Sequence, residues 1–243
     1  MGNVKKTQRL EVNKLFLPYD VYERHRKVAS FINVNQTVLD VGGELDHLSQ
    51  FISPAKIIVA NLISGDVIIT KDKLPFPKNS FDVVCAIDVL EHIPKSNRER
   101  FVKNLIRVSS NKVILSFPIG TRQHILYEKN LEMWLVKKKL DVVYLKEHIR
   151  FGLPTQDELL RIGKNFETKV YYSGNIRVNN ILFKIFVLNP KIKLIGKFIY
   201  FLKLLFNFLT NSILYFLLIN KPYSQKINRA YVVILKGKAR FDL

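Results

Sequence analysis

The sequence predicts an α/β protein built on a mostly parallel sheet with helices on both faces. Six or seven short apolar runs alternate along the chain with segments of helical periodicity. This alternation is typical of parallel strands joined by crossover helices. The 243 residues suffice for one such domain with room for one sizeable insertion.

The run 37–43 is predicted to be a buried strand that ends near a carboxylate and turns on two glycines. Its apolar residues are mostly β-branched, as a central parallel strand requires. Asp40 lies near the carboxyl end, the edge at which open α/β sheets bind ligands. Gly42 and Gly43 allow a sharp turn and a close approach of the backbone to a ligand. A plain strand followed by a tight turn would have the same pattern.

A second run, 74–94, contains two prolines, then an apolar strand, then Asp88, Glu91 and His92. The runs 37–43 and 74–94 together resemble the class I S-adenosylmethionine-dependent methyltransferases, in particular the group related to the type 11 methyltransferase domain. The resemblance covers residues 31–118 well and the rest of the chain loosely. It implies a Rossmann-like sheet of seven strands, with the seventh antiparallel between the fifth and the sixth. It also implies S-adenosylmethionine as the cofactor.

The resemblance implies cofactor-binding roles for eight residues. They are Asp40, Gly42, Gly43, Asn61, Lys71, Asp72, Ile87 and Asp88. In the family, the position of Asn61 normally holds an acidic residue that binds both ribose hydroxyls, and an asparagine can still accept and donate hydrogen bonds there. The segment around Lys71 and Asp72 should pass beside the adenine. Asp88 should lie beside the sulfonium.

His92 and His148 are the candidate catalytic residues. Methyl transfer is an in-line displacement at a sulfonium carbon, so the enzyme mainly supplies orientation and a dry pocket. A base is needed only when the acceptor is a hydroxyl or an amine. For His92, a structural hydrogen bond at a helix start or loop is the alternative. No Cys/His spacing predicts a metal site, and Cys85 is expected to be buried and inert.

The remaining elements follow from periodicity and capping signals. Residues 1–18 are expected to form a flexible basic segment, and residues 19–243 the methyltransferase domain. Further strands are expected at 56–60, 67–70, 83–87, 112–117, 167–172 and 230–236. Helices are expected at 21–32, capped by Asp20, and at 97–108, with Ser96 and Glu99 as a capping box. A third helix is expected at 123–140, with Leu126, Leu131, Trp134 and Leu135 on its inward side. A fourth helix should follow Thr155, with Glu158 as the capping-box partner of Thr155.

Residues 176–226 are predicted to be a basic, apolar helical insertion before the last strand. The stretch 198–219 is long enough to span a bilayer. Lys203, Asn207, Thr210 and Asn211 nevertheless form one polar stripe, and the last strand must return to the sheet. These observations favour helices in the membrane interface, with residues 181–226 on an anionic surface. The alternatives are a lid packed on the domain or on a second subunit, and a helix that spans the membrane.

The net charge of +19 indicates a polyanionic partner, either a membrane surface or a nucleic acid. After Glu167 the only acidic residue is Asp242, against thirteen lysines and arginines. The N-terminus lacks the pattern of a signal peptide, which favours a cytoplasmic protein.

The function predicted from these features is methylation of a lipid-linked or membrane-proximal acceptor by a peripheral protein on the inner face of the membrane. The run 147–154, which resembles a segment of methyltransferases from surface-polysaccharide clusters, favours a glycan. An RNA methyltransferase and a non-catalytic scaffold at the membrane are the alternatives. The oligomeric state is left open.

Overall fold

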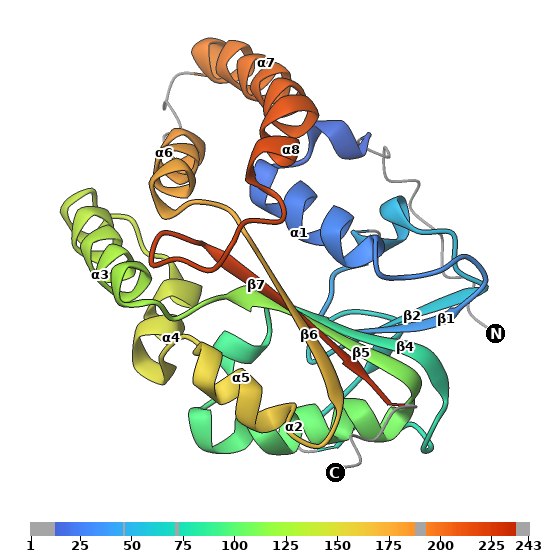
Figure 1. Cartoon of the computed structure of the whole chain (residues 1–243). Helices are drawn as coiled ribbons and strands as arrows, with labels where there is room; N and C mark the ends of the chain where they lie inside the picture. Colours follow the sequence, from blue (N-terminus) through green and yellow to red (C-terminus); the bar gives the residue numbers. More distant parts are fainter. Residues whose placement is uncertain (1–12, 46, 71–72, 188–192, 237–243) are drawn as a thin grey trace.

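A computed structural model describes residues 13–45, 47–70, 73–187 and 193–236 (Figure 1). Within these residues, seven strands form one sheet in the order β3-β2-β1-β4-β5-β7-β6. Strands β1 to β5 pair in parallel, and β7 runs antiparallel between β5 and β6. This confirms the fold and the position of the last strand. The strands are β1 Thr37–Val41, β2 Lys56–Asn61, β3 Val67–Ile68, β4 Phe81–Ile87, β5 Ser109–Pro118, β6 Glu167–Ser173 and β7 Arg229–Leu235.

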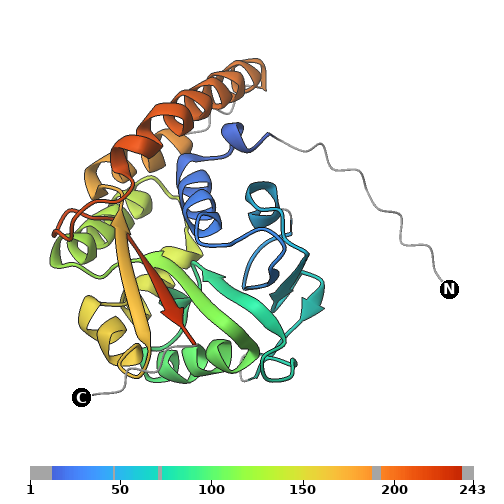
Figure 2. The same ribbon diagram turned by 45° about the vertical axis from the view of Figure 1, so that its right-hand side comes forward.

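Helices cover both faces of the sheet (Figures 1 and 2). Val84 in β4 faces one side and packs with Leu105 of α2, whereas its neighbour Val83 faces the other and packs with Val28 of α1. This alternation is the two-residue period of a strand buried on both faces. The helices are α1 Tyr19–Ala29, α2 Lys95–Val108, α3 Arg122–Lys137, α4 Val143–Phe151, α5 Gln156–Ile162, α6 Ile176–Val187, α7 Lys193–Leu209 and α8 Tyr215–Leu218, with short turns η1 Lys14–Phe16, η2 Leu48–Phe51, η3 Leu90–His92 and the π-helical η4 Thr210–Leu214.

Two of the three predicted helix caps are wrong. Helices α1 and α2 begin directly after Pro18 and Pro94, and neither start has a side-chain cap. The fixed φ of proline prepares the chain for a helix, so the polar residue that follows lies inside the first turn. Asp20 therefore pairs with Arg24.

In α2, Ser96 likewise lies inside the first turn, and its expected capping-box partner Glu99 pairs with Lys103. The third cap is confirmed, because the Thr155 hydroxyl accepts a hydrogen bond from the Glu158 amide at 3.3 Å. The Glu158 carboxylate does not complete a capping box but pairs with the buried Arg98.

The inward side of α3 is only partly as predicted. Leu131 and Leu135 are buried against α4, as expected, but Leu126 is exposed. Five residues correspond to about 140° around a helix, so Leu126 and Leu131 cannot share a face. Trp134 is partly buried and lies under the Lys184 ammonium of α6.

The segment before α1 is ordered over its described part. The amide of Asn207 donates to the Phe16 carbonyl at 2.9 Å, and that of Asn211 donates to the carbonyls of Leu15 and Leu17. The insertion therefore supplies donors for the carbonyls of this segment, and the expected flexibility of residues 1–18 stays a prediction. Residues 1–12 lie outside the described residues.

The insertion is helical, as predicted, and it leaves from β6 and returns through β7 (Figure 1). Its polar stripe faces the domain: Asn207 and Asn211 are buried, and the Lys203 ammonium donates to the Phe186 carbonyl. The opposite side exposes a row of apolar side chains. They include Phe198, Phe201, Leu205, Leu209, Ile213, Phe216 and Leu217.

Residues Gly196–Leu218 form the one stretch of the described chain that is long and apolar enough to cross a membrane by length and composition. Its mean hydropathy is 1.6, and 17% of its most apolar part is buried inside the protein. The insertion is therefore packed on the domain along one side and unpartnered along the other.

Replacing Asn211 by alanine should release the segment 13–17 from the insertion. The change removes the N–H donors of two partly buried carbonyls, which should lower the free energy of unfolding by about 1–3 kcal/mol. Urea denaturation and limited proteolysis near Leu17 measure this effect. Ser212→Ala is the matched control, because Ser212 lies on the same turn but is exposed. Equal stability of the two variants would contradict the docking role of Asn211.

Candidate active site

The two glycines after β1 are required by the packing of their neighbours. Gly42 has φ +80°, and a Cβ there would lie 2.5 Å from Cγ2 of Val89. A Cβ on Gly43 would lie 2.1 Å from Oδ2 of Asp40. Both distances are far below van der Waals contact, so any other residue would displace Val89 or Asp40. The close approach of this backbone turn to a ligand stays a prediction.

Asp40 lies under this turn and is completely buried. Neither of its carboxylate oxygens has a hydrogen-bond partner among the described residues. Burial raises the pKa of Asp40 from 3.8 to about 7. A buried carboxylate without donors is costly, and such groups are found at binding sites more often than elsewhere.

Asn61, at the end of β2, holds the same turn. Its amide nitrogen donates to the Gly43 carbonyl at 2.8 Å and to the Gly42 carbonyl at 3.3 Å. Its amide oxygen accepts from the Leu62 amide at 2.6 Å. An aspartate could not make the first two bonds, which is a physical reason for asparagine here. The expected contact with a ribose stays a prediction.

Asp88 follows β4 at the carboxyl edge of the sheet, with a positive φ of 54°. Its carboxylate pairs with Arg24 of α1 at 2.8 Å and with Arg229 of β7. Burial alone would raise the pKa of Asp88, but Arg229 and Arg24 outweigh this effect and hold it well below its usual range. Ile87 is buried at the end of β4. Lys71 and Asp72 lie outside the described residues.

A cavity of about 580 Å³ lies between this edge, helices α1, α3 and α4, and the insertion. One part of its wall is polar and contains Asp88, Glu91, His92, His148 and Arg229. Another part is apolar and contains Leu131, Leu182, Phe183, Phe186 and Phe206, from α3, α6 and α7. The cavity can therefore take a molecule with one polar and one apolar part.

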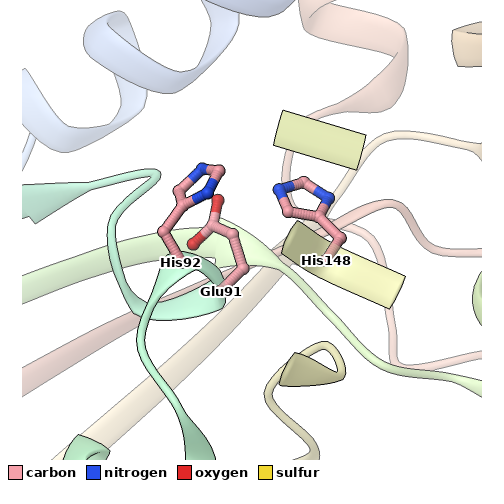
Figure 3. A group of neighbouring side chains, drawn as sticks. All are labelled: Glu91, His92 and His148. Carbon is pink, nitrogen blue, oxygen red and sulfur yellow. The ribbon is translucent and has the colours of Figure 1, made fainter. Parts of the chain in front are cut away.

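The fold brings His92 and His148 together, although 55 residues separate them in the chain (Figure 3). Their ring centroids are 4.9 Å apart. Nδ1 of His92 is 2.7 Å from a Glu147 oxygen, and Nδ1 of His148 is 2.8 Å from a Glu128 oxygen. Burial and the neighbouring His148 lower the pKa of His92, which favours its neutral form.

Glu91 completes this cluster, and the sequence reasoning missed it. Its carboxylate is buried, and burial together with Asp88 raises the pKa of Glu91 well above its usual range. The ligand atoms of Glu91, His92 and His148 all lie within 4.8 Å of one another. The prediction of no metal site rested on sequence spacing, and only the packing of α4 on η3 brings these three residues together.

Two further charged residues at this edge were also missed. Arg229 begins an apolar strand, and a charged residue at the carboxyl edge of a sheet is a usable signal. Glu128 lies in the middle of α3 among other charged residues, and nothing in the sequence distinguishes it from a solvated side chain.

Comparison with known proteins agrees with this architecture. Residues 34–117 match the family described as "Methyltransferase domain". The match begins before β1 and ends in β5, so it contains the glycine turn, Asn61 and the run from Asp88 to His92. No curated protein matches the sequence.

Two solved bacterial proteins share the fold at low sequence identity. An S-adenosylmethionine-dependent methyltransferase of Thermotoga maritima is 16% identical, with a TM-score of 0.53 over 92% of this chain and 93% of that one. The YcgJ protein of Bacillus subtilis is 13% identical, with a TM-score of 0.52 over 90% and 100% of the two chains. Phosphoethanolamine N-methyltransferase 2 of Haemonchus contortus is 13% identical with a TM-score of 0.47, and the chain spans 50% of its length.

Asp40→Asn should make the protein more stable at neutral and alkaline pH. A folded-state pKa near 7 against 3.8 means that the folded state holds a proton that the unfolded state has lost. The free energy of unfolding of wild type should therefore fall by up to roughly 4 kcal/mol as the pH rises from 4 towards 7. That of the variant should not fall in this way, because asparagine does not titrate. Urea denaturation of both proteins from pH 4 to pH 8 measures the difference. A difference independent of pH would contradict the burial of a lone carboxylate.

Asn61→Asp should weaken the binding of S-adenosylmethionine, although the family normally has an acidic residue here. The new carboxylate would face the carbonyl oxygens of Gly42 and Gly43 instead of donating to them. The loss should be about 1 kcal/mol or more, measured by calorimetric titration. Tighter binding by the variant would show that the turn rearranges and that residue 61 faces the ribose.

Proposed function

This chain belongs to the class I S-adenosylmethionine-dependent methyltransferases, and we propose that it methylates an amphiphilic, lipid-linked acceptor at the cytoplasmic face of a membrane. The observation that carries the proposal is the cavity, whose wall is polar beside Asp88 and apolar under α6 and α7. In the family, the end of the fourth strand lies beside the sulfonium. An acceptor would therefore place its polar group at Asp88 and its apolar part under the insertion.

The cofactor supplies an electrophilic methyl group when bound, and the protein supplies orientation and a dry environment. Asn61 holds the turn where the family binds the cofactor, and Asp40 lies directly under it. The apolar side chains from α6 and α7 would reduce the contact of a bound acceptor with water. His92 and His148 are the candidate bases for a hydroxyl or amine acceptor.

A sugar hydroxyl is the acceptor group that we favour. The comparisons give no support to the resemblance with surface-polysaccharide clusters, so this preference rests on the position of the run 147–154. Glu147 of this run binds His92, and His148 lies in the cavity wall. A small phenolic or amine acceptor would be served by the same groups.

The exposed side of the insertion supports a membrane as its partner. Its apolar side chains face outward while its polar stripe faces the domain. A surface helix in contact with water has the opposite arrangement, with its polar side outward. Exposed lysines at positions 197, 221 and 226 flank this side and would meet anionic headgroups. Such a surface would bring the cavity close to a lipid-linked substrate.

The alternatives make different use of the same features. A lid packed on a second subunit would bury the apolar side in a dimer, and a true span would place 196–218 across the bilayer. An RNA methyltransferase would use the basic charge but not the apolar side. A scaffold would not bind the cofactor, so calorimetric titration with S-adenosylmethionine separates it from the enzymes.

Changing the exposed apolar side should weaken membrane binding without affecting the binding of the cofactor. In a triple variant with serine at Phe198, Phe201 and Leu205, vesicle affinity should fall by at least about tenfold, because each side chain loses apolar burial. Cosedimentation with anionic vesicles measures it, and S-adenosylmethionine affinity should not change. The matched control replaces three exposed apolar residues of α3, namely Leu126, Met133 and Val136, by serine.

Other outcomes identify the alternatives. Unchanged vesicle binding in the triple variant would overturn the membrane proposal. If wild type is a dimer and the triple variant is a monomer, the apolar side is a contact between two subunits. If nuclease treatment removes the protein from the membrane fraction, RNA is its partner. Point variants are preferred to deletion of residues 181–220, because deletion would expose Tyr19 and Tyr22, which pack on Leu182 and Tyr215.

A further inference from the structure

Glu91, His92 and His148 form a compact group of ligand atoms at the polar wall of the cavity (Figure 3). Glu91 and His92 belong to the turn η3, which follows β4, and His148 comes from α4. Their side chains point towards one another from these two elements. The group is defined by two short rigid segments that pack directly on each other.

Two of the three side chains present buried atoms without a partner. Glu91 is 1% exposed and His148 is 7% exposed. Among the described residues, Oε2 of Glu91 and Nε2 of His148 have no hydrogen-bond partner. Buried polar atoms are almost always satisfied in folded proteins, so two unsatisfied atoms in one cluster point to a missing ligand.

Both imidazoles are held in the orientation that metal ligands require. The Glu147 carboxylate accepts the Nδ1–H of His92, and the Glu128 carboxylate accepts the Nδ1–H of His148. A proton on Nδ1 leaves the lone pair of a neutral imidazole on Nε2. Carboxylates that fix metal-binding histidines in this way are the usual outer layer of a metal site.

We propose that Glu91, His92 and His148 bind one divalent transition-metal ion. Two imidazole nitrogens and one carboxylate suit Zn²⁺, Fe²⁺ or Mn²⁺ better than Ca²⁺ or Mg²⁺, which prefer oxygen ligands. Tetrahedral ligand atoms about 2.1 Å from an ion lie about 3.4 Å apart. The ligand atoms, now within 4.8 Å of one another, would therefore approach one another by up to about 1.4 Å, which a change in side-chain torsion angles can supply.

Three protein ligands leave a coordination position open towards the cavity, which is the arrangement of catalytic rather than structural sites. The consequence for the reaction rests on the proposed function. An acceptor hydroxyl bound at the open position would have a lowered pKa and would lose its proton to solvent water. Its oxygen would then form a bond to the methyl carbon as the carbon–sulfur bond breaks, releasing S-adenosylhomocysteine. The ion would take over the task assigned to a free imidazole base.

The test measures metal binding by the full, tag-free chain, without acceptor or cofactor. After dialysis against a chelator, Zn²⁺ and Mn²⁺ are titrated separately by calorimetry, and the bound metal is counted by elemental analysis. Wild type should bind one equivalent, and Co²⁺ should give the visible absorption of a site with nitrogen ligands. Failure of the chain to methylate any acceptor would leave this result untouched, so the two proposals fail separately.

Variants localise the ion. Glu91→Gln and His148→Ala should lose binding, while His47→Ala, which removes a histidine in contact with His25 instead, should keep it. Because the Glu147 side chain is 45% exposed, Glu147→Gln should fold normally and bind about tenfold to a hundredfold more weakly. The proposal would be overturned if wild type binds no ion, or if all variants bind the ion as tightly as wild type does.

Discussion

The partly buried carboxylate of Asp88 connects three parts of the chain that are far apart in sequence. It pairs with Arg24 of α1 and with Arg229 of β7, and Arg229 also lies 3.8 Å from a Glu23 oxygen. Burying these charges is costly, and removing one partner would leave the others uncompensated. The network therefore fixes α1 and the start of β7 against the carboxyl edge of the sheet. Since the insertion ends directly before β7, the same contacts determine where it lies over the cavity.

The insertion contributes to the site through the side that faces the domain. Asn207 and Asn211 bind the segment before α1, and Leu182 and Tyr215 pack on Tyr19 and Tyr22 of α1. A helix whose polar residues face inward must expose its apolar residues, because the two lie on opposite sides. The exposed apolar side is thus a consequence of how the insertion is held.

The fold could be predicted because it depends on short-range patterns. Strand β1 and its glycine turn occupy seven consecutive residues, and the cap at Thr155 needs only the next turn of helix. The wrong caps show the limit of such reasoning. Ser96 and Asp20 are good capping residues, but the prolines nearby had already set where the helices begin.

The sequence by itself determined the alternation of strands and helices, because this follows from hydrophobic periodicity. Two local motifs carried the resemblance that implied the place of the antiparallel last strand. Tertiary structure alone decided that Glu91 and His92 meet His148, that Asn61 holds the glycine turn, and that the polar stripe of the insertion faces inward. These contacts join residues many positions apart, and their geometry depends on how whole elements pack. Periodicity identifies which face of an element is apolar, but only packing decides what that face meets.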